Sequence, residues 1–297
     1  MCSLEKIYKN SVENHEIDNM GHMNVQFYVQ HALDACKLFF VEKSWINKSH
    51  SLGSAFHLKT MLIRYLREQT LATPFGISAN LVHITNNEIV IFLEMHNLQT
   101  KEISAAFLLT LGHHLNQNKD SQVLSRISEN LASPKFYVPE HGLKKGLSNL
   151  PILNLNYSKI DKLSNILDSF RGVATGKNSH EVALLNAADY MGIVSKAVPH
   201  LLLAAGHSVK DTNIGGAALE YEFRFNRFVK AGSGVNLKSG LRQITKKTYT
   251  WTHWLIDIET TEVLAVADSV IITMDLRTRK SVSIPRKMNE KLKQILI

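Results

Sequence analysis

A helical pattern of buried positions begins near Asn24. Positions that recur every three or four residues lie on one face of a helix, and such a stripe is typical of a helix buried on one side. The stripe consists of Tyr28, His31, Ala32, Ala35 and Phe39. The pattern therefore predicts a half-buried helix that starts at about Asn24.

Four strand-like segments follow this helix, at about residues 60–68, 76–84, 88–96 and 102–113. Turns are predicted at Asn86-Asn87 and over residues 97–101. Alternate positions in the two middle strands are apolar, which indicates one buried sheet face. These positions are Ile77, Ala79, Leu81, Ile89, Ile91, Leu93 and Met95.

The same order of elements returns later in the chain. A second helix is predicted over residues 186–205, although Pro199 should kink or interrupt it. Strands are predicted over residues 218–228, 233–244, 247–257 and 262–275, with a turn at 257–260 and a short amphipathic helix within 285–297. Runs of strands after one long helix predict an α+β fold with antiparallel sheets.

An internal repeat explains this recurrence. The block Arg64-Tyr65-Leu66-Arg67 matches Arg224-Phe225-Asn226-Arg227, 160 positions further on. Residues 83–85 and 100–105 match 243–245 and 260–265 at the same offset, while Asn24 and Tyr28 match Asn186 and Tyr190 at an offset of 162. We therefore expect a first domain over 1–115, a linker over 116–165 that is polar and proline-containing, and a second domain over 166–297 that includes the C-terminal helix.

Composition narrows the class of protein. Apolar residues make up 44% of the chain and charged residues 20%, which predicts a folded protein with a substantial core. The formal charge of +8 favours a polyanionic ligand or partner, but it also fits a merely basic surface. The basic cluster near the C-terminus is interpreted as a solvated face; it comprises Arg277, Arg279, Lys280, Arg286 and Lys287.

Several function classes find no support in the sequence. The two cysteines, Cys2 and Cys36, form no disulfide framework or metal motif and fit a reducing cytosol. Residues 1–10 lack an apolar stretch, and no run of about 18 apolar residues exists, so we expect a cytoplasmic protein without a membrane span. No phosphate-binding glycine loop and no basic motif interleaved with aromatic residues appears, so neither a cofactor nor nucleic acid is expected. Nor do the histidines follow a metal-ligand spacing; those considered are His57, His83, His96, His113 and His114.

The segment that carries candidate chemistry is residues 15–24, followed by Tyr28. A loop that leads into a helix presents unpaired N–H groups, which favour the negative charge that develops on a carbonyl oxygen during nucleophilic attack. Asp18 could act there as a general base or as a nucleophile, and Gly21 would allow close backbone approach. The alternative interpretation makes Asp18 part of a simple turn.

The other polar residues of this segment also have two interpretations. Asn24 could hold a water molecule or only cap the helix. His22 and Tyr28 could position the loop or a bound substrate, or His22 could satisfy backbone groups and Tyr28 could face the core.

The pattern Asp18-x-x-Gly21-His22-x-Asn24-x-x-x-Tyr28 resembles the active-site signature of hotdog thioesterases of the 4-hydroxybenzoyl-CoA type. The block 64–68 and a later Glu-x-x-x-Ala pattern also resemble bacterial members. The resemblance covers nearly all of the first repeat and, more loosely, the second. It implies two tandem hotdog domains, each a curled antiparallel sheet around one long helix, that pair with an active site at their seam.

The resemblance also implies site residues and a substrate. Asp18, Gly21, His22 and Asn24 would be catalytic, and the substrate would be an acyl-CoA or, less expected, an acyl carrier protein thioester. Tyr28 would contact substrate, and so would Arg64, which could also be structural, like Arg67, Arg224 and Arg227. The fused pair could remain monomeric or form a homo-oligomer.

The second repeat departs from the signature. Asp18, Gly21 and His22 correspond to His180, Ala183 and Leu184, whereas Asn186 and Tyr190 keep the pattern. We therefore expect one Asp-bearing site per chain, with the second repeat as its partner wall.

Two competing functions fit the same fold. The altered second repeat would suit a non-catalytic acyl-binding or regulatory protein. A hotdog hydratase or dehydratase would have a histidine about five residues after the aspartate, flanked by Asn-Pro, which the Asp18–Asn24 segment does not match.

Overall fold

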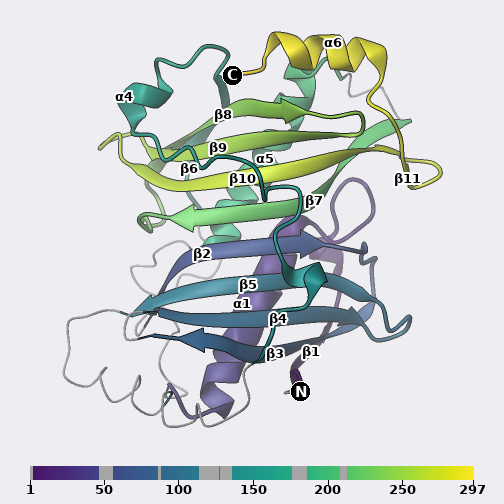
Figure 1. The fold of residues 1–297 in the computed structure, drawn as a ribbon, viewed down its shortest axis with the longest axis vertical. Coiled ribbons are helices and arrows are strands. Elements are labelled where there is room, and N and C mark those ends of the chain that lie inside the picture. The colour runs from purple at the N-terminus through teal and green to yellow at the C-terminus, as the bar shows by residue number, and fades with distance from the viewer. Residues whose placement is uncertain are drawn as a thin grey trace. The chain divides into compact units, whose positions relative to one another are not determined.

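The computed structural model describes residues 3–46, 56–85, 88–113, 127, 136–175, 186–207 and 213–297 (Figure 1). The chain divides into two compact units, Met1–Lys144 and Lys145–Ile297. The finer division expected from the sequence, at residues 1–115, 116–165 and 166–297, stays a prediction. No helix in the described ranges is long and apolar enough to cross a membrane.

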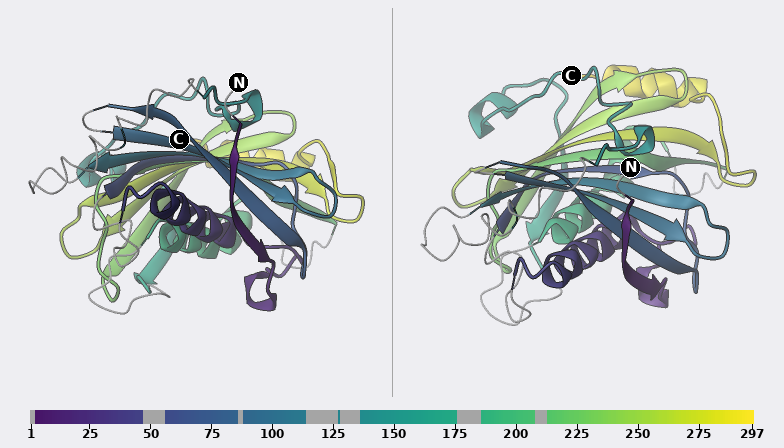
Figure 2. Two further views of the ribbon diagram at one scale, coloured as in Figure 1. Left: turned by 90° about the horizontal axis from the view of Figure 1, so that it is seen from below. Right: turned by 60° about the horizontal axis from the view of Figure 1, so that its bottom comes forward.

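Unit 1 has one antiparallel sheet with the strand order β1-β3-β4-β5-β2. One long helix, α1, lies along a face of this sheet (Figure 2). The elements are β1 (Glu5–Ser11), η1 (Asn14–Glu16), α1 (Val25–Glu42), β2 (Phe56–Tyr65), β3 (Pro74–Ile84), β4 (Glu88–Asn97), β5 (Ile103–His113) and η3 (Glu140–Gly142).

The core of unit 1 forms where the helix stripe meets the alternating strand positions. All five stripe residues of α1 are buried, as the sequence predicted. So are the alternating positions of β4, which run from Ile89 to Met95. The helix begins at Val25 because the Asn24 side chain accepts a hydrogen bond from the Gln26 N–H at 2.9 Å.

Unit 2 has a second antiparallel sheet with the order β7-β10-β9-β8-β6, and β11 pairs with β10. Its long helix, α5, packs against β6 and β8. The elements are α4 (Tyr157–Ile160), β6 (Leu167–Val173), α5 (Ala187–Ala204), β7 (Ile214–Phe225), β8 (Gly234–Ile244), β9 (Thr248–Asp257), β10 (Val263–Asp275), β11 (Lys280–Ser281) and α6 (Arg286–Gln294).

The predicted long helices and the four predicted strands in each half are present, with boundaries that differ by a few residues. The strand predicted over 60–68 begins at Phe56 and ends at Tyr65. The predicted turn at Asn86-Asn87 lies outside the described residues. Two edge strands, β1 and β6, were not predicted, because each buries few side chains and shows no clear apolar alternation.

Of the two effects expected of Pro199, a kink or an interruption of the second helix, the interruption was wrong. Helix α5 runs from Ala187 through Pro199 to Ala204. A proline inside a helix costs roughly 3 kcal/mol, since it removes one backbone hydrogen bond. Buried residues on both sides of it, Ala197 and Leu201, keep the helix packed across this position.

Matching hydrogen bonds occur in the two halves of the chain. The Tyr28 hydroxyl donates to the Arg67 carbonyl at 3.3 Å, and the Tyr190 hydroxyl donates to the Arg227 carbonyl at 2.8 Å. Left-handed residues also recur at equivalent turns, with φ of 64° at Lys101 and 59° at Thr261. The two halves therefore share local geometry as well as element order.

The described part of the predicted linker packs on the sheets. In unit 1, the Phe136 ring stacks on Phe92 of β4 with 5.7 Å between the ring centroids, and the His141 Nε2 of η3 forms a hydrogen bond with Glu94. In unit 2, the Leu153 carbonyl accepts a hydrogen bond from the Trp254 indole at 3.3 Å. These contacts tie residues 136–155 to sheet faces (Figure 1).

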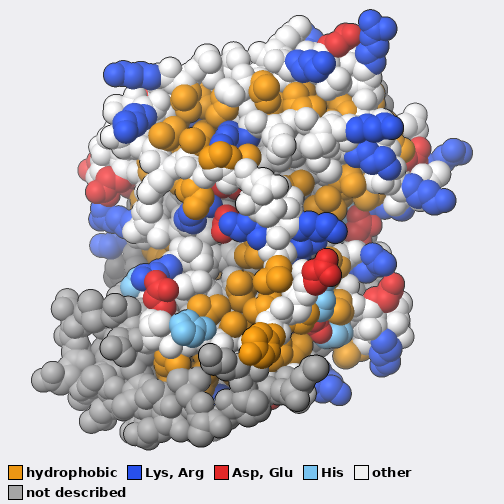
Figure 3. Space-filling model, in the orientation of Figure 1, with side chains coloured by type: hydrophobic (Ala, Val, Ile, Leu, Met, Phe, Trp, Pro, Cys, Tyr) orange, Lys and Arg blue, Asp and Glu red, His pale blue; other side chains and the backbone are white. Residues whose placement is uncertain are grey.

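Three segments of unit 2 together form a basic surface. The backbone carbonyl of Lys246 accepts a hydrogen bond from the Ile284 N–H at 2.9 Å, which brings the β8–β9 turn beside the start of α6. Lys and Arg side chains gather beside α6 and β11 (Figure 3). We define this basic surface by its exposed residues, Lys246, Lys247, Arg277, Lys280, Arg286, Lys287, Lys291 and Lys293.

Candidate active site

Residues 17–23 fold back on themselves just before α1. Ile17 and Met23 form an antiparallel bridge, and the Asp18 N–H donates to the His22 carbonyl at 2.9 Å. Gly21 has a backbone φ of +87°, a conformation that residues other than glycine rarely adopt. Apart from the two adjacent residues, no part of the protein lies within 4 Å of the position that a Cβ would occupy there. The turn conformation, rather than a close contact within the protein, therefore explains this glycine.

The Asp18 carboxylate is partly exposed and held from one side. Its Oδ1 accepts a hydrogen bond from the Met20 N–H at 2.8 Å and lies 3.5 Å from the His22 Nδ1. Burial by itself would raise the pKa of this carboxyl, but the bonds from the His22 side chain and the Met20 amide outweigh burial and lower the pKa. The side chain is 24% exposed, so an ionised carboxylate is accessible at neutral pH.

His22 lies between two acidic side chains. Its Nδ1 faces Asp18, and its Nε2 lies 3.7 Å from Glu68 Oε1. The ring is only 14% exposed. Glu68 belongs to the 64–68 block that resembles bacterial members of the family, but its proximity to His22 depends on how the segment after β2 passes the 17–23 loop.

Most amide groups around the start of α1 already have partners. The Met23 N–H donates to the Gln69 carbonyl and the Asn24 N–H to the Glu16 carbonyl, both at 2.8 Å. The Asn24 side chain and carbonyl accept the N–H groups of Gln26 and Phe27. Within the described ranges, no acceptor is found for the Val25 N–H. The helix therefore keeps one donor available at its start.

Tyr28 and Arg64 make structural contacts. Tyr28 is buried, its hydroxyl accepts the Gln69 N–H at 2.9 Å, and burial raises the pKa of its phenol. The Arg64 Nη1 donates to the Leu143 carbonyl at 2.6 Å. The structure thus gathers Asp18, Gly21, His22 and Asn24 in one loop, and gives Tyr28 and Arg64 partners within the protein.

The asparagine cap of this arrangement recurs in unit 2. Asn186 caps α5 by accepting the Ala188 N–H at 2.8 Å, as Asn24 caps α1. His180, Ala183 and Leu184, which correspond to Asp18, Gly21 and His22, lie outside the described residues.

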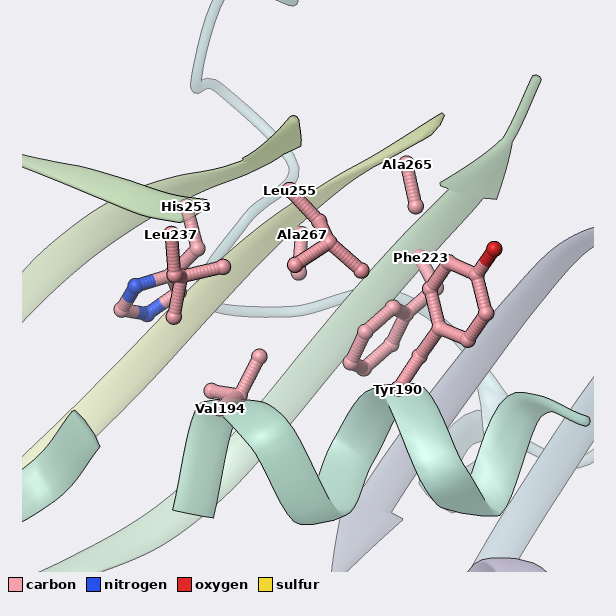
Figure 4. A pocket seen from close by; sticks show the side chains of 8 residues that line it. All are labelled: Tyr190, Val194, Phe223, Leu237, His253, Leu255, Ala265 and Ala267. Atoms are coloured by element: carbon pink, nitrogen blue, oxygen red, sulfur yellow. The ribbon is translucent and has the colours of Figure 1, made fainter. Parts of the chain in front are cut away.

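A small cavity of about 10 Å³ lies between α5 and the sheet of unit 2 (Figure 4). Its lining is mainly apolar and includes Tyr190, Val194, Phe223, Leu237, His253, Leu255, Ala265 and Ala267. A cavity of this size has room for about one water molecule, so it does not accommodate an acyl chain.

The His253 ring beside this cavity is buried and bonded at both nitrogens. Its Nδ1 lies 2.8 Å from the Ser239 hydroxyl, and its Nε2 lies 3.1 Å from the Ser269 hydroxyl. Burial lowers the pKa of this imidazole to about 4, which keeps it neutral at ordinary pH. In the described part of the chain, no group of three or more His, Cys, Asp or Glu side chains could hold a metal ion.

Residues 12–135 and 178–292 match a family model described as the thioesterase-like superfamily. The chain belongs to this superfamily. Comparison with curated proteins gave no match. Membership identifies the chain as an enzyme that hydrolyses thioesters, with a hotdog-like fold built on large antiparallel sheets.

Solved structures of thioesterases share this fold over most of the chain. The 12:0-ACP thioesterase from Umbellularia californica matches with a TM-score of 0.65 and 12% identity, covering 90% of this chain and 93% of that one. A Lactobacillus plantarum protein described as an oleoyl thioesterase matches with a TM-score of 0.64 and 11% identity, covering 91% and 96%. An acyl-ACP thioesterase from Bacteroides thetaiotaomicron matches with a TM-score of 0.61 and 9% identity, covering 89% and 96%. At these identities the likeness concerns the fold.

Proposed function

We propose that this thioesterase hydrolyses acyl thioesters of phosphopantetheine, carried by CoA or by an acyl carrier protein, at the Asp18 site. The observation that carries the proposal is the ionised, partly exposed Asp18 carboxylate beside the start of α1. The carrier proteins in the names of the similar structures make the acyl carrier protein an alternative to CoA that needs direct testing.

The developing negative charge needs a donor, and the Val25 N–H is the candidate. It lies at the positive end of the α1 dipole and has no acceptor among the described residues. A donor of this kind contributes roughly 3–4 kcal/mol to transition-state stabilisation. The amide at the helix start would therefore polarise the thioester carbonyl while Asp18 acts on its carbon.

Asp18 has two chemical routes. As a nucleophile, its carboxylate oxygen forms a bond to the acyl carbon, the C–S bond breaks and the thiolate leaves; water then hydrolyses the acyl anhydride and returns the carboxylate. As a general base, it removes a proton from a water molecule that attacks the same carbon. Its lowered pKa keeps the carboxylate ionised, as both routes require.

The neighbouring residues hold this carboxylate in place. His22 donates to Asp18 and keeps it charged, Gly21 provides the left-handed turn, and Asn24 caps α1. Tyr28 fixes the segment at Arg67 and Gln69 that passes beside the loop. In this proposal only Asp18 and the Val25 amide contact the reacting thioester.

The two units correspond in this proposal to tandem hotdog domains, each with a sheet curled around its long helix. The repeat in unit 2 has His180 where unit 1 has Asp18, so it lacks the acidic group. One catalytic site per chain follows.

Thiol release from a panel of acyl-CoA and acyl carrier protein substrates tests the function. We expect Asp18→Asn to reduce kcat by about a thousandfold or more while the fold persists, because the substitution removes the reacting carboxylate. Asp189→Asn is a matched control: it alters a carboxylate at the start of α5, and we expect activity within about twofold of the wild type.

Two further experiments distinguish CoA from the acyl carrier protein and the nucleophilic route from the general-base route. Comparing the same acyl group on CoA and on the carrier protein identifies the carrier. A single turnover in ¹⁸O-water labels the Asp18 carboxylate by the nucleophilic route when water attacks the Asp18 carbonyl of the anhydride, whereas a general base leaves it unlabelled. Full activity of Asp18→Asn would rule out the site, and thermal stabilisation by acyl-CoA without thiol release would instead identify a binding protein.

A further inference from the structure

A chain of three polar side chains, of which His31 and Glu16 are buried and Tyr8 is half-buried, lies close to the Asp18 loop. His31 on α1 places its Nε2 2.8 Å from Glu16 Oε1 and its Nδ1 3.0 Å from the Tyr8 hydroxyl of β1. His31 is 5% exposed and Glu16 is 4% exposed. The Phe75 ring packs edge-on against His31, with 4.8 Å between the ring centroids. This chain joins β1, η1 and α1 inside unit 1.

Glu16 connects this chain of side chains to the site. Its backbone carbonyl accepts the Asn24 N–H at 2.8 Å, and its side-chain Oε2 accepts the Glu13 N–H at 3.0 Å. The Ile17–Met23 bridge and then Asp18 follow immediately. Glu16 thus bonds to Asn24 at the end of the loop through its carbonyl and to His31 on α1 through its side chain.

An acid, a histidine and a hydroxyl in sequence also form the pattern of a nucleophilic triad. Burial raises the pKa of the Tyr8 phenol, and its oxygen already accepts a hydrogen bond from the Asn10 amide at 2.9 Å. The Tyr8 hydroxyl thus has partners in both His31 and Asn10, and we interpret the chain as a structural network.

Unit 2 shows that the fold itself does not need this histidine. The position that corresponds to His31 in α5, 162 residues further on, is Ile193, which is buried and apolar. Replacing a buried polar pair by well-packed apolar residues is often neutral or stabilising. Unit 1, which has Asp18, therefore has the polar His31 at a position where unit 2 has the apolar Ile193.

We propose that His31 is a positioning residue of the thioesterase: through Glu16 it fixes the 17–24 loop, and with it the Asp18 carboxylate, against α1. This inference rests on the proposed function. A positioning group affects the rate because a displacement of about 1 Å at the reacting atoms costs about a hundredfold in rate.

His31→Leu tests the inference, with His253→Leu as the matched control. Both histidines are buried and bonded at both ring nitrogens, but His253 belongs to the core of unit 2. We expect His31→Leu to lower kcat by about 10- to 100-fold with KM within about twofold, and to speed amide hydrogen exchange over residues 17–24. The control should lose stability but keep kcat per folded molecule and keep the exchange of residues 17–24.

The conservative variant His31→Gln retains a donor for Glu16 and should recover most of the lost kcat. Unchanged kcat and unchanged exchange over 17–24 in His31→Leu would overturn the inference, as would equal effects of the control. If the wild-type chain releases no thiol from any substrate, the proposed function fails, and the exchange comparison of the two leucine variants still decides whether His31 positions the loop.

Discussion

At the scale of single residues, the charge of Asp18 is decided by its neighbours. Burial disfavours the carboxylate, whereas the His22 side chain and the Met20 amide favour it and outweigh burial. Removing the His22 ring removes one favourable group and leaves the burial, so the pKa of Asp18 must rise.

We therefore predict that His22→Leu moves the acidic limb of the kcat/KM profile to higher pH. In the wild type, activity should persist as the pH falls through the ordinary aspartate pKa of about 3.8 and be lost only below it, where the carboxylate takes up its proton. Carboxyl ¹³C NMR of Asp18 across the pH range in which the protein stays folded gives the pKa directly. Glu68→Gln is the control, since it keeps the His22 ring; a pKa of Asp18 that stays low in His22→Leu would contradict the assignment.

The sequence identified the local part of this site. Asp18, Gly21, His22 and Asn24 are close in the chain, and their turn and cap depend on local backbone geometry. The Glu16–His31 contact joins residues 15 positions apart, so no motif indicated it.

At the scale of elements, packing decides which weak patterns become structure. Helix α6 is strongly polar apart from Met288 and Leu292, which are buried in a cluster with Leu241, Trp251 and Leu201. A helix of 9 residues is too short to be stable alone. The burial of Met288 and Leu292 therefore stabilises α6 against the sheet.

We predict that Leu292→Ala lowers the free energy of unfolding of unit 2 by about 3 kcal/mol, because it leaves a cavity beside Trp251. Urea denaturation followed by tryptophan fluorescence measures the change. Lys293→Ala, an exposed neighbour on the same helix, should change it by less than about 0.5 kcal/mol. Equal effects of the two substitutions would show that α6 is not held by its apolar side.

At the scale of the whole molecule, the excess of basic residues acts through long-range electrostatics. The chain carries a formal charge of +8, and the basic surface of unit 2 concentrates part of it. A positive field raises the association rate of anionic ligands, and salt screens that field over about 8–10 Å at physiological ionic strength.

We predict that kcat/KM for an acyl-CoA falls severalfold when NaCl is raised from about 50 to about 500 mM, because CoA carries phosphate groups. The same acyl group on N-acetylcysteamine, a neutral thiol, is the control and should respond weakly. Equal salt dependence of the two substrates would show that the charge does not act on CoA.

The sequence by itself determined the elements, the repeat and the position of the acidic loop, since apolar periodicity and turn residues act over a few neighbouring positions. Tertiary structure decided the rest. It kept α5 helical through Pro199, added the edge strands β1 and β6, brought Lys246 beside α6 and joined His31 to Glu16. Each of these features depends on contacts between segments that are far apart in the sequence. The local pattern of apolar and polar residues does not indicate such contacts.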